Sequence, residues 1–385
     1  MTAAPPRAEG TGPDAPADAI EVSAPGKLFV AGEYAVVEAG YPAVLVAVDR
    51  HVTVRLARAE GAGSIASDQY GRLPVVWRRR GDRVVLDHDS RPFDYVLAAI
   101  DVVERFAAEQ GRPLGFYDIT ITSELDDQSG RKFGLGSSAA VTAATVRALD
   151  RFYALDLPTE QLLRLALLAT VAVNPMGSGG DVAASLYGGW IRYAALDREW
   201  LRTALAAAEA SGAARPLSAL LDADWPGLSV RRLPTPRSMR LVVGWTGVPA
   251  STTRLVERMQ SRKGAAESHY PDFLAASRAC VDALADAIER DDAPAAKEQI
   301  HRARGLLTSL AHAAGVDIET PALRTLCETA ESVGAAAKSS GAGGGDCGIV
   351  LVDADTDLEP MLRDWALSDV RHLSLRVQQP CEEAP

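Results

Sequence analysis

The chain of 385 residues contains few cysteines, histidines and lysines, and these shortages narrow the classes of protein to which it can belong. Its four cysteines show neither the spacing of metal ligands nor a disulfide framework: Cys280, Cys327, Cys347 and Cys381. Acidic residues outnumber basic ones, and the net charge of −11 argues against general nucleic-acid binding, which needs a basic face. We therefore expect a cytoplasmic protein, from a reducing compartment, that binds no nucleic acid.

Long apolar runs are also missing, so no segment is expected to span a membrane. The first 19 residues carry four prolines and no apolar signal core, and they are predicted to form a disordered tail. The remaining composition, 47% hydrophobic and 24% charged, is that of an ordinary globular protein. The length favours two domains, which we place at residues 20–225 and 226–385, divided at Pro226-Gly227.

The most informative stretch is a glycine loop at residues 132–140 that follows a charged segment and precedes a long run rich in alanine and valine. Gly134 and Gly136 permit a tight turn and a close approach to a ligand. Ser137 or Ser138 is a natural N-cap, so a helix is expected behind the loop. Such a helix start either is a purely structural cap or binds an anion, because its first N–H groups lack partners inside the helix.

Two further loops are rich in small residues. The first, residues 174–181, leads into a helix with Asp181 in its first turn, where a carboxylate either stabilises the helix or takes part in chemistry. The second, residues 338–348, contains more glycines than a β-turn needs: Gly341, Gly343, Gly344 and Gly345. Close approach by a ligand or by another loop explains that excess better than a turn does.

Near the N-terminus, Lys27 precedes the apolar residues 28–30. A lysine in this position either lies at a solvated strand end or directs its charge into a cleft, here beside Glu33. Its neighbours, residues 21–37, read as two strands separated by a turn at Pro25-Gly26.

Periodicity and turn residues predict an α+β chain. Strands are expected at residues 43–48, 52–57, 73–79, 83–86, 116–123, 190–193, 240–245 and 371–377, and on both sides of the loop at 338–348. Helices are expected at residues 94–110, 137–154, 158–173, 195–225, 254–262 and 357–367, after Asp181, and three times within 266–331.

Two nucleotide-binding motifs compete for the glycine loop. A Walker A loop requires a lysine after its last glycine, and residues 134–139 contain none. The spacing does match a dinucleotide-binding loop, and Asp156 lies 20 residues past Gly136. That motif, however, follows a core strand, whereas this loop follows a charged segment. A nucleoside triphosphate held by backbone N–H groups fits better.

Taken together, the three glycine-containing stretches resemble the three motifs of the GHMP kinases in content, order and spacing. They are residues 25–34, 134–140 and 338–348, and the resemblance extends over roughly residues 20–378. Within that family the chain is most similar to the phosphomevalonate kinases, because of residues 32–38, 132–138, 177–181, 243–246 and 338–349. Mevalonate kinases typically have histidine at the position of Tyr34 and lack the Gly244-Trp245-Thr246 stretch.

This resemblance implies a two-domain GHMP kinase fold, with an N-terminal domain like ribosomal protein S5 domain 2, a ferredoxin-like C-terminal domain, and the active site in the cleft between them. It implies ATP-dependent phosphorylation of (R)-5-phosphomevalonate to (R)-5-diphosphomevalonate, with Mg²⁺, in the mevalonate pathway of isoprenoid synthesis. A monomer or homodimer is expected. The implied catalytic residues are Lys27 and Asp181. The implied ATP phosphate-binding residues are Lys132, Gly134, Leu135, Gly136, Ser137, Ser138 and Ala139, with Ser138 also a metal ligand. The implied substrate-binding residues are Glu33, Tyr34, Ser178, Gly179, Ser340, Gly341, Ala342 and Gly343.

One departure concerns the metal, since Thr170 stands where related mevalonate kinases carry a glutamate ligand. A phosphorylated acceptor also needs cations, for which the candidates are Lys132, Arg192, Arg254 and residues 78–80. Because that acceptor is already largely deprotonated at neutral pH, Asp181 is expected to orient the reactants more than to remove a proton. Mevalonate kinase is the alternative activity, and a non-catalytic small-molecule binder is the alternative class.

Overall fold

The computed structural model describes residues 19–71, 73–81, 83–87, 93–127, 129–210, 216–247 and 269–380. Its strands are β1 (Ile20–Ala31), β2 (Pro42–Ala59), β3 (Gly63–Ser67), β4 (Val75–Arg80), β5 (Arg83–Leu86), β6 (Phe116–Ser123), β7 (Trp190–Ala194), β8 (Ser229–Leu233), β9 (Met239–Trp245), β10 (Ala336–Ser339), β11 (Cys347–Asp353) and β12 (Arg371–Leu373). Its helices are α1 (Asp94–Glu109), α2 (Ser137–Tyr153), α3 (Thr159–Val173), α4 (Gly180–Tyr187), α5 (Arg198–Ala210), α6 (Leu217–Leu221), α8 (Tyr270–Glu289), α9 (Ala293–Ala314), α10 (Pro321–Glu331) and α11 (Glu359–Leu367), with a short 3-10 helix, η1 (Ala35–Val37).

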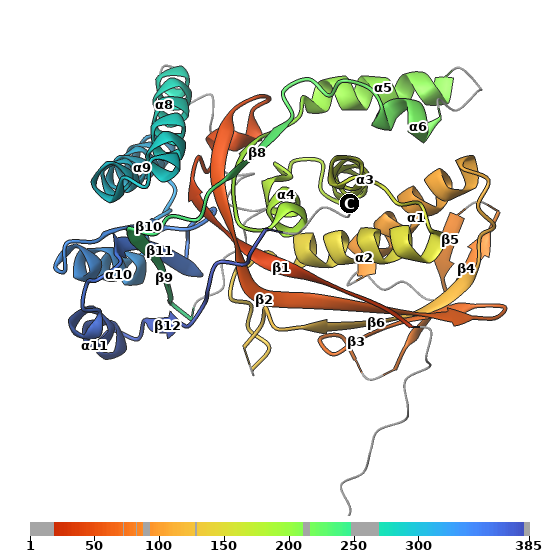
Figure 1. The fold of residues 1–385 in the computed structure, drawn as a ribbon, viewed down its shortest axis with the longest axis horizontal. Helices are drawn as coiled ribbons and strands as arrows, with labels where there is room; N and C mark the ends of the chain where they lie inside the picture. Colours follow the sequence, from red (N-terminus) through yellow and green to blue (C-terminus); the bar gives the residue numbers. More distant parts are fainter. Residues whose placement is uncertain are drawn as a thin grey trace, which may run out of the picture.

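The larger sheet runs in the order β5-β4-β3-β6-β2-β7-β8, and β1 pairs with β2. All its neighbouring strands are antiparallel except β3 and β6, which are parallel. Helices α1 to α4 cover one face of this sheet (Figure 1). Their buried aliphatic residues form one hydrophobic core with the inward-facing residues of β1, β2 and β6.

The structure corrects the expected pattern of strands near the N-terminus. Residues 20–31 form one strand, and Pro25-Gly26 is an irregularity inside it, not a turn: Pro25 pairs with His51, whereas Gly26 pairs with Val48. The two runs expected at 43–48 and 52–57 are likewise one strand of 18 residues, β2. A β-bulge accounts for both errors, because it interrupts the side-chain pattern without ending the strand. The strands β3 and β8 were not expected.

A second sheet of four strands, β10-β11-β9-β12, lies beside the first, and helices α10 and α11 pack on it (Figure 1). The expected α+β class is thus confirmed, with one sheet in each part of the chain. The expected domain boundary at 225/226 stays a prediction. Strand β8, which follows that position in the chain, pairs with β7 in the larger sheet, and β9 is the first strand of the smaller sheet. Near the C-terminus, the chain returns to the larger sheet, where Gln378 accepts a hydrogen bond from the Gly189 amide.

Most expected helices are present within a residue or two of their predicted bounds, including α1, α2 and α3, and three helices occur within 266–331 as expected. The helix expected at 195–225 is wrong in its extent: the segment contains α5 and a separate short helix, α6, for which Pro216 is the N-cap, and residues 222–225 are not helical. The helix expected at 254–262 and nearly all of the expected tail at 1–19 lie outside the described residues. Within the described ranges, every helix is too short or too polar to traverse a lipid bilayer.

Candidate functional site

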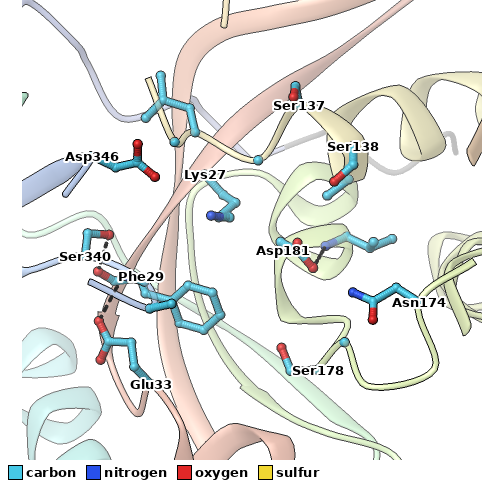
Figure 2. A pocket seen from close by; sticks show the side chains of 18 of the residues that line it. Lys27, Phe29, Glu33, Ser137, Ser138, Asn174, Ser178, Asp181, Ser340 and Asp346 are labelled. Atoms are coloured by element: carbon cyan, nitrogen blue, oxygen red, sulfur yellow. Dashed lines mark hydrogen bonds between the residues drawn. The ribbon is translucent and has the colours of Figure 1, made fainter. Parts of the chain in front are cut away.

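One cavity of about 350 Å³ brings the three predicted motifs together. Every residue predicted for the site lines it, with the exception of Gly179. Figure 2 shows Lys27 near its middle, with Asp346, Ser340 and Glu33 on one side and Ser137, Ser138, Asp181 and Asn174 on the other. Residues 338–348, hereafter the third loop, therefore lie opposite the starts of helices α2 and α4, with Lys27 between them (Figure 2).

The glycine loop presents the beginning of α2 to the cavity. Gly134 and Gly136 both have φ of +81°, a left-handed conformation that suits glycine. Gly136 is the N-cap of α2 and Ser137 is its first helical residue, so the expected serine cap is wrong. No side chain among the described residues accepts a hydrogen bond from the first backbone amides of α2. These amides therefore point out of the N-terminal end of the helix, where an anion is favoured.

Lys27 lies in β1 directly beneath this loop. Its backbone amide donates to the Leu135 carbonyl at 2.9 Å, and a Cβ added at Gly136 would lie 2.8 Å from the Lys27 Cε. The side chain is only 8% exposed, and its Nζ lies 5.4 Å from the centre of the Phe29 ring. Among the described residues it has no ion pair with Asp181, although the two side chains face each other across the cavity (Figure 2). Lys27 is therefore directed into a cleft, and it is not a solvated strand end.

Asp181 occupies the first turn of α4, where its Oδ1 accepts from the Val182 amide at 3.1 Å. Gly179 caps this helix in a left-handed conformation, and a Cβ there would lie 2.3 Å from the Leu167 side chain. Gly179 therefore allows the start of α4 to approach the Leu167 side chain closely, although it does not itself line the cavity. Thr170 does line it, but its hydroxyl donates to the Ala166 carbonyl of its own helix at 2.8 Å.

The loop before α4 is anchored by Arg198. The guanidinium of Arg198 donates to the Met176 and Gly177 carbonyls at 2.9 and 3.0 Å, and to the Val37 carbonyl beside the first motif. On the other side, the Tyr193 hydroxyl donates to the Ser178 carbonyl at 2.7 Å. The loop is thus held in a fixed position although it contains mostly small residues.

The third loop contacts the first motif and a neighbouring loop. Ser340 donates to the Phe29 carbonyl at 2.9 Å, and the Tyr34 hydroxyl donates to the Ala342 carbonyl at 2.5 Å. A Cβ at Gly343 would lie 2.3 Å from the Ile318 carbonyl oxygen, so this glycine permits close approach by another loop. The expected reason for the excess of glycine is confirmed at this position.

Among the polar residues that line the cavity, Tyr95, Asn174 and Asp346 were not predicted as site residues from the sequence. Burial, followed by the charge of Asp181, raises the pKa of the Tyr95 hydroxyl, while hydrogen bonds with Asn174 and Ser138 oppose that shift. Asp346 lies against Gly134, whose added Cβ would be 2.7 Å from the Asp346 Cβ. Asn174 and Asp346 stand inside predicted loops, which was a usable signal. Tyr95, at the start of an ordinary amphipathic helix, gave none.

Of the basic residues expected to bind a phosphate group on the acceptor, Lys132 lines the cavity. The others in the described residues do not line it, and some of them have carboxylate partners elsewhere: Arg192 pairs with Asp282, and Arg79 with Glu104. Arg78 pairs with Asp87 and Arg80 ends the hairpin strand, so the run at 78–80 is excluded from this cavity. Arg254 lies outside the described residues.

The oxygen atoms of Ser138 and Asp181 suit Mg²⁺, a hard cation that keeps several waters and binds through one or two carboxylates and substrate phosphates. The described residues contain no cluster of three acidic, histidine or cysteine side chains fit for a metal.

Models of the GHMP kinase N-terminal and C-terminal domains match residues 94–189 and 284–367. A phosphomevalonate kinase of Streptomyces sp. strain CL190 is 44% identical over 364 residues, 91% of this chain and 95% of that protein. A mevalonate kinase of Pyrococcus horikoshii is 28% identical over 336 residues, 85% of this chain and 87% of that protein. The solved structure of the Streptococcus pneumoniae phosphomevalonate kinase in complex with phosphomevalonate and AMPPNP has a TM-score of 0.80 at 28% identity, covering 93% of this chain and 99% of that one.

The higher identity to a phosphomevalonate kinase than to a mevalonate kinase extends over nearly the whole chain, so it is not confined to the shared glycine motifs. The chain belongs to the GHMP kinases, and within that family to the phosphomevalonate kinases.

Proposed function

We propose that the chain transfers the γ-phosphoryl group of ATP to the phosphate of (R)-5-phosphomevalonate, which gives ADP and (R)-5-diphosphomevalonate in the mevalonate pathway. The observation that carries the proposal is the meeting of three features in one cavity: the open N-terminus of α2, the buried Lys27 and the carboxylate of Asp181. The related enzyme of known structure binds both phosphomevalonate and an ATP analogue.

In this proposal, the nucleotide phosphates lie at residues 134–139. The positive end of the α2 dipole and the first N–H groups of the helix favour negative charge there. Lys132, two residues before Gly134 in the chain, also lines the cavity and adds a full positive charge. Such a site needs no Walker A lysine, because backbone groups do most of the binding.

In the transfer step, an oxygen of the acceptor phosphate forms a bond to the γ-phosphorus while the bond from that phosphorus to the β,γ-bridging oxygen breaks. Lys27 stabilises the charge on the transferring group, the main catalytic requirement of phosphoryl transfer. The acceptor phosphate has a second pKa of about 6 and is mostly a dianion at pH 7, so it needs no general base. Asp181 therefore orients Lys27 and the reactants from the opposite wall.

Mg²⁺ bound to the ATP phosphates supplies further charge neutralisation, and Ser138 and Asp181 are the residues that would hold it. The acceptor would be contacted by Ser178, in the loop before α4, and from the other side of Lys27 by residues 340–343 of the third loop, all of which line the cavity (Figure 2). A cytoplasmic setting and a monomer or homodimer complete the proposal, the former supported by the buried free thiols of Cys280, Cys327 and Cys347.

The decisive experiment measures ADP release from Mg-ATP with 5-phosphomevalonate and mevalonate offered separately. Turnover with 5-phosphomevalonate alone supports the proposal. Turnover with mevalonate alone would move the activity to mevalonate kinase and would restore Asp181 as a general base. Binding of ATP without turnover of either acceptor would indicate a non-catalytic binder.

A further inference from the structure

A buried ion pair joins the first motif to the third loop. The Lys338 ammonium donates to Glu33 Oε1 across 305 positions of sequence, and the two side chains are 0% and 3% exposed. Lys338 belongs to β10, which leads directly into the loop that lines the cavity. Glu33 lies between β1, which carries Lys27, and the short helix η1.

The two residues share further contacts that make them one unit. The Lys338 ammonium also donates to the Ser339 carbonyl at 2.6 Å, and the Gly341 amide donates to Glu33 Oε1 at 3.3 Å. Within the described part of the chain, the other oxygen, Glu33 Oε2, is buried without a hydrogen-bond partner. Within the described residues, Glu33 Oε1 therefore accepts every hydrogen bond made to this carboxylate, and each donor belongs to the strand or the loop of the third motif.

A buried ion pair is a costly way to stabilise a fold, because two charges lose their water and hydrophobic residues of similar volume often serve as well. What such a pair does provide is a defined geometry, since neither charge can move away from the other without a large penalty. Here that geometry concerns a loop of the candidate active site. Two other contacts act in the same direction, from Ser340 to the Phe29 carbonyl and from Tyr34 to the Ala342 carbonyl.

We propose that Glu33 and Lys338 are positioning residues, which set the third loop relative to Lys27 for the transfer reaction. Glu33 acts through Lys338 and the Gly341 amide and is not a ligand of the acceptor, which differs from the role that family resemblance implies for it. The inference rests on the proposed function for its kinetic consequence. Its structural part, the placement of residues 340–343, does not depend on which acceptor is used.

The test compares Glu33→Gln, Lys338→Met and the double variant with the wild type. Each single variant leaves one buried charge unpaired, whereas the double variant has two neutral side chains of nearly unchanged size and is expected to fold. We expect kcat to fall by about 10²-fold in each, the loss that a displacement near 1 Å produces in an active site. Because one interaction is removed in all three, the double variant should be no slower than the slower single variant.

The Lys297–Asp353 pair provides a control with the same charged groups but greater exposure, 18% and 43% against 0% and 3% for Lys338 and Glu33. It is also a lysine–carboxylate pair, at 2.7 Å, and it joins α9 to the end of β11 away from the cavity. Lys297→Met and Asp353→Asn should change the free energy of unfolding while leaving kcat unchanged. A general loss of stability therefore does not explain a fall in kcat that is confined to the Glu33 and Lys338 variants.

Amide hydrogen exchange of residues 340–343, measured without substrates, gives a readout independent of catalysis. Faster exchange in the Glu33 and Lys338 variants, and not in the control variants, is expected. Unchanged exchange would overturn the proposal, as would a Glu33→Gln enzyme with normal kcat and a raised KM for the acceptor. If the wild type fails to phosphorylate 5-phosphomevalonate, the proposed function fails, and the exchange experiment still decides the role of the pair.

Discussion

Replacing Gly136 with alanine tests whether Lys27 acts at the reacting phosphate. Gly136 has φ of +81°, and alanine in a left-handed conformation costs about 1–2 kcal/mol. The added Cβ would lie 2.8 Å from the Lys27 Cε, whereas ordinary van der Waals contact begins at 3.4 Å. The Lys27 side chain must therefore move by about 0.6 Å, and a misplacement of that order lowers kcat by about 10- to 100-fold.

Gly111→Ala is the control for the backbone cost alone. Gly111 has φ of +71°, but no atom lies within 4 Å of an added Cβ, and the residue does not line the cavity. Both variants should lose about 1–2 kcal/mol in the free energy of unfolding, measured with urea. Only Gly136→Ala should also lose kcat in an assay of ADP release.

The double variant Gly136→Ala/Lys27→Met isolates the contact between the two residues. If alanine acts through Lys27, then adding it to Lys27→Met should lower kcat no further. A Gly136→Ala enzyme with normal kcat and the same stability loss as Gly111→Ala would refute the reasoning. It would mean that the position of Lys27 within the cavity does not limit the reaction.

Three further predictions concern Asp181, Arg198, which holds the loop before α4, and two buried cysteine thiols. Asp181→Asn should lower kcat by less than about 10³-fold without removing a titrating base from the pH–rate profile; a larger loss with that base removed would show general-base catalysis. Arg198→Met removes three hydrogen bonds to loop carbonyls and should raise the KM for 5-phosphomevalonate by about tenfold, with little effect on the KM for ATP in initial-rate assays. Burial raises the pKa of Cys280 from 9.0 to about 11 and that of Cys327 to about 12, so their stabilising contribution is complete below pH 9 and is lost as the pH rises through these values. Urea unfolding between pH 9 and 11 should therefore show a smaller loss of stability in Cys280→Ala/Cys327→Ala than in the wild type.

The sequence was sufficient for those parts of the molecule that depend on local chemistry. Helices α1 and α3 have regular apolar spacing and end near Gly111 or begin after Pro158, so their bounds follow from neighbouring residues. The three glycine loops could be predicted in the same way, because a backbone turn at positive φ favours glycine at that position whatever the rest of the fold. The site residues within those loops could be named for this reason.

Contacts between distant segments were not predictable. The polar residues Asp49 and Arg50 separate two apolar runs and suggest a turn, yet β2 continues through them as a bulge. Their setting becomes clear only with the C-terminal segment, because the Arg376 amide donates to Asp49 Oδ1 and the Asp49 amide donates to the Arg376 carbonyl. The pairing of Glu33 with Lys338 escaped prediction for the same reason.

Residues 27–37, which include most of the first motif, contact each of the other loops that line the cavity. The Lys27 amide holds the glycine loop, the Phe29 carbonyl and the Tyr34 hydroxyl hold the third loop, and the Val37 carbonyl holds the second through Arg198. Residues 27–37, which we call the reference segment, therefore hold in place the three loops that contribute the rest of the cavity.

Gly26 lies where this reference segment meets the glycine loop. An added Cβ would lie 2.9 Å from the Leu125 side chain and 3.0 Å from the Leu135 carbonyl, the group that accepts from the Lys27 amide. Because a backbone carbonyl cannot turn away as a flexible side chain can, a larger residue here must displace the loop or the strand. The requirement for glycine at this position comes from the close fit between the first motif and the glycine loop.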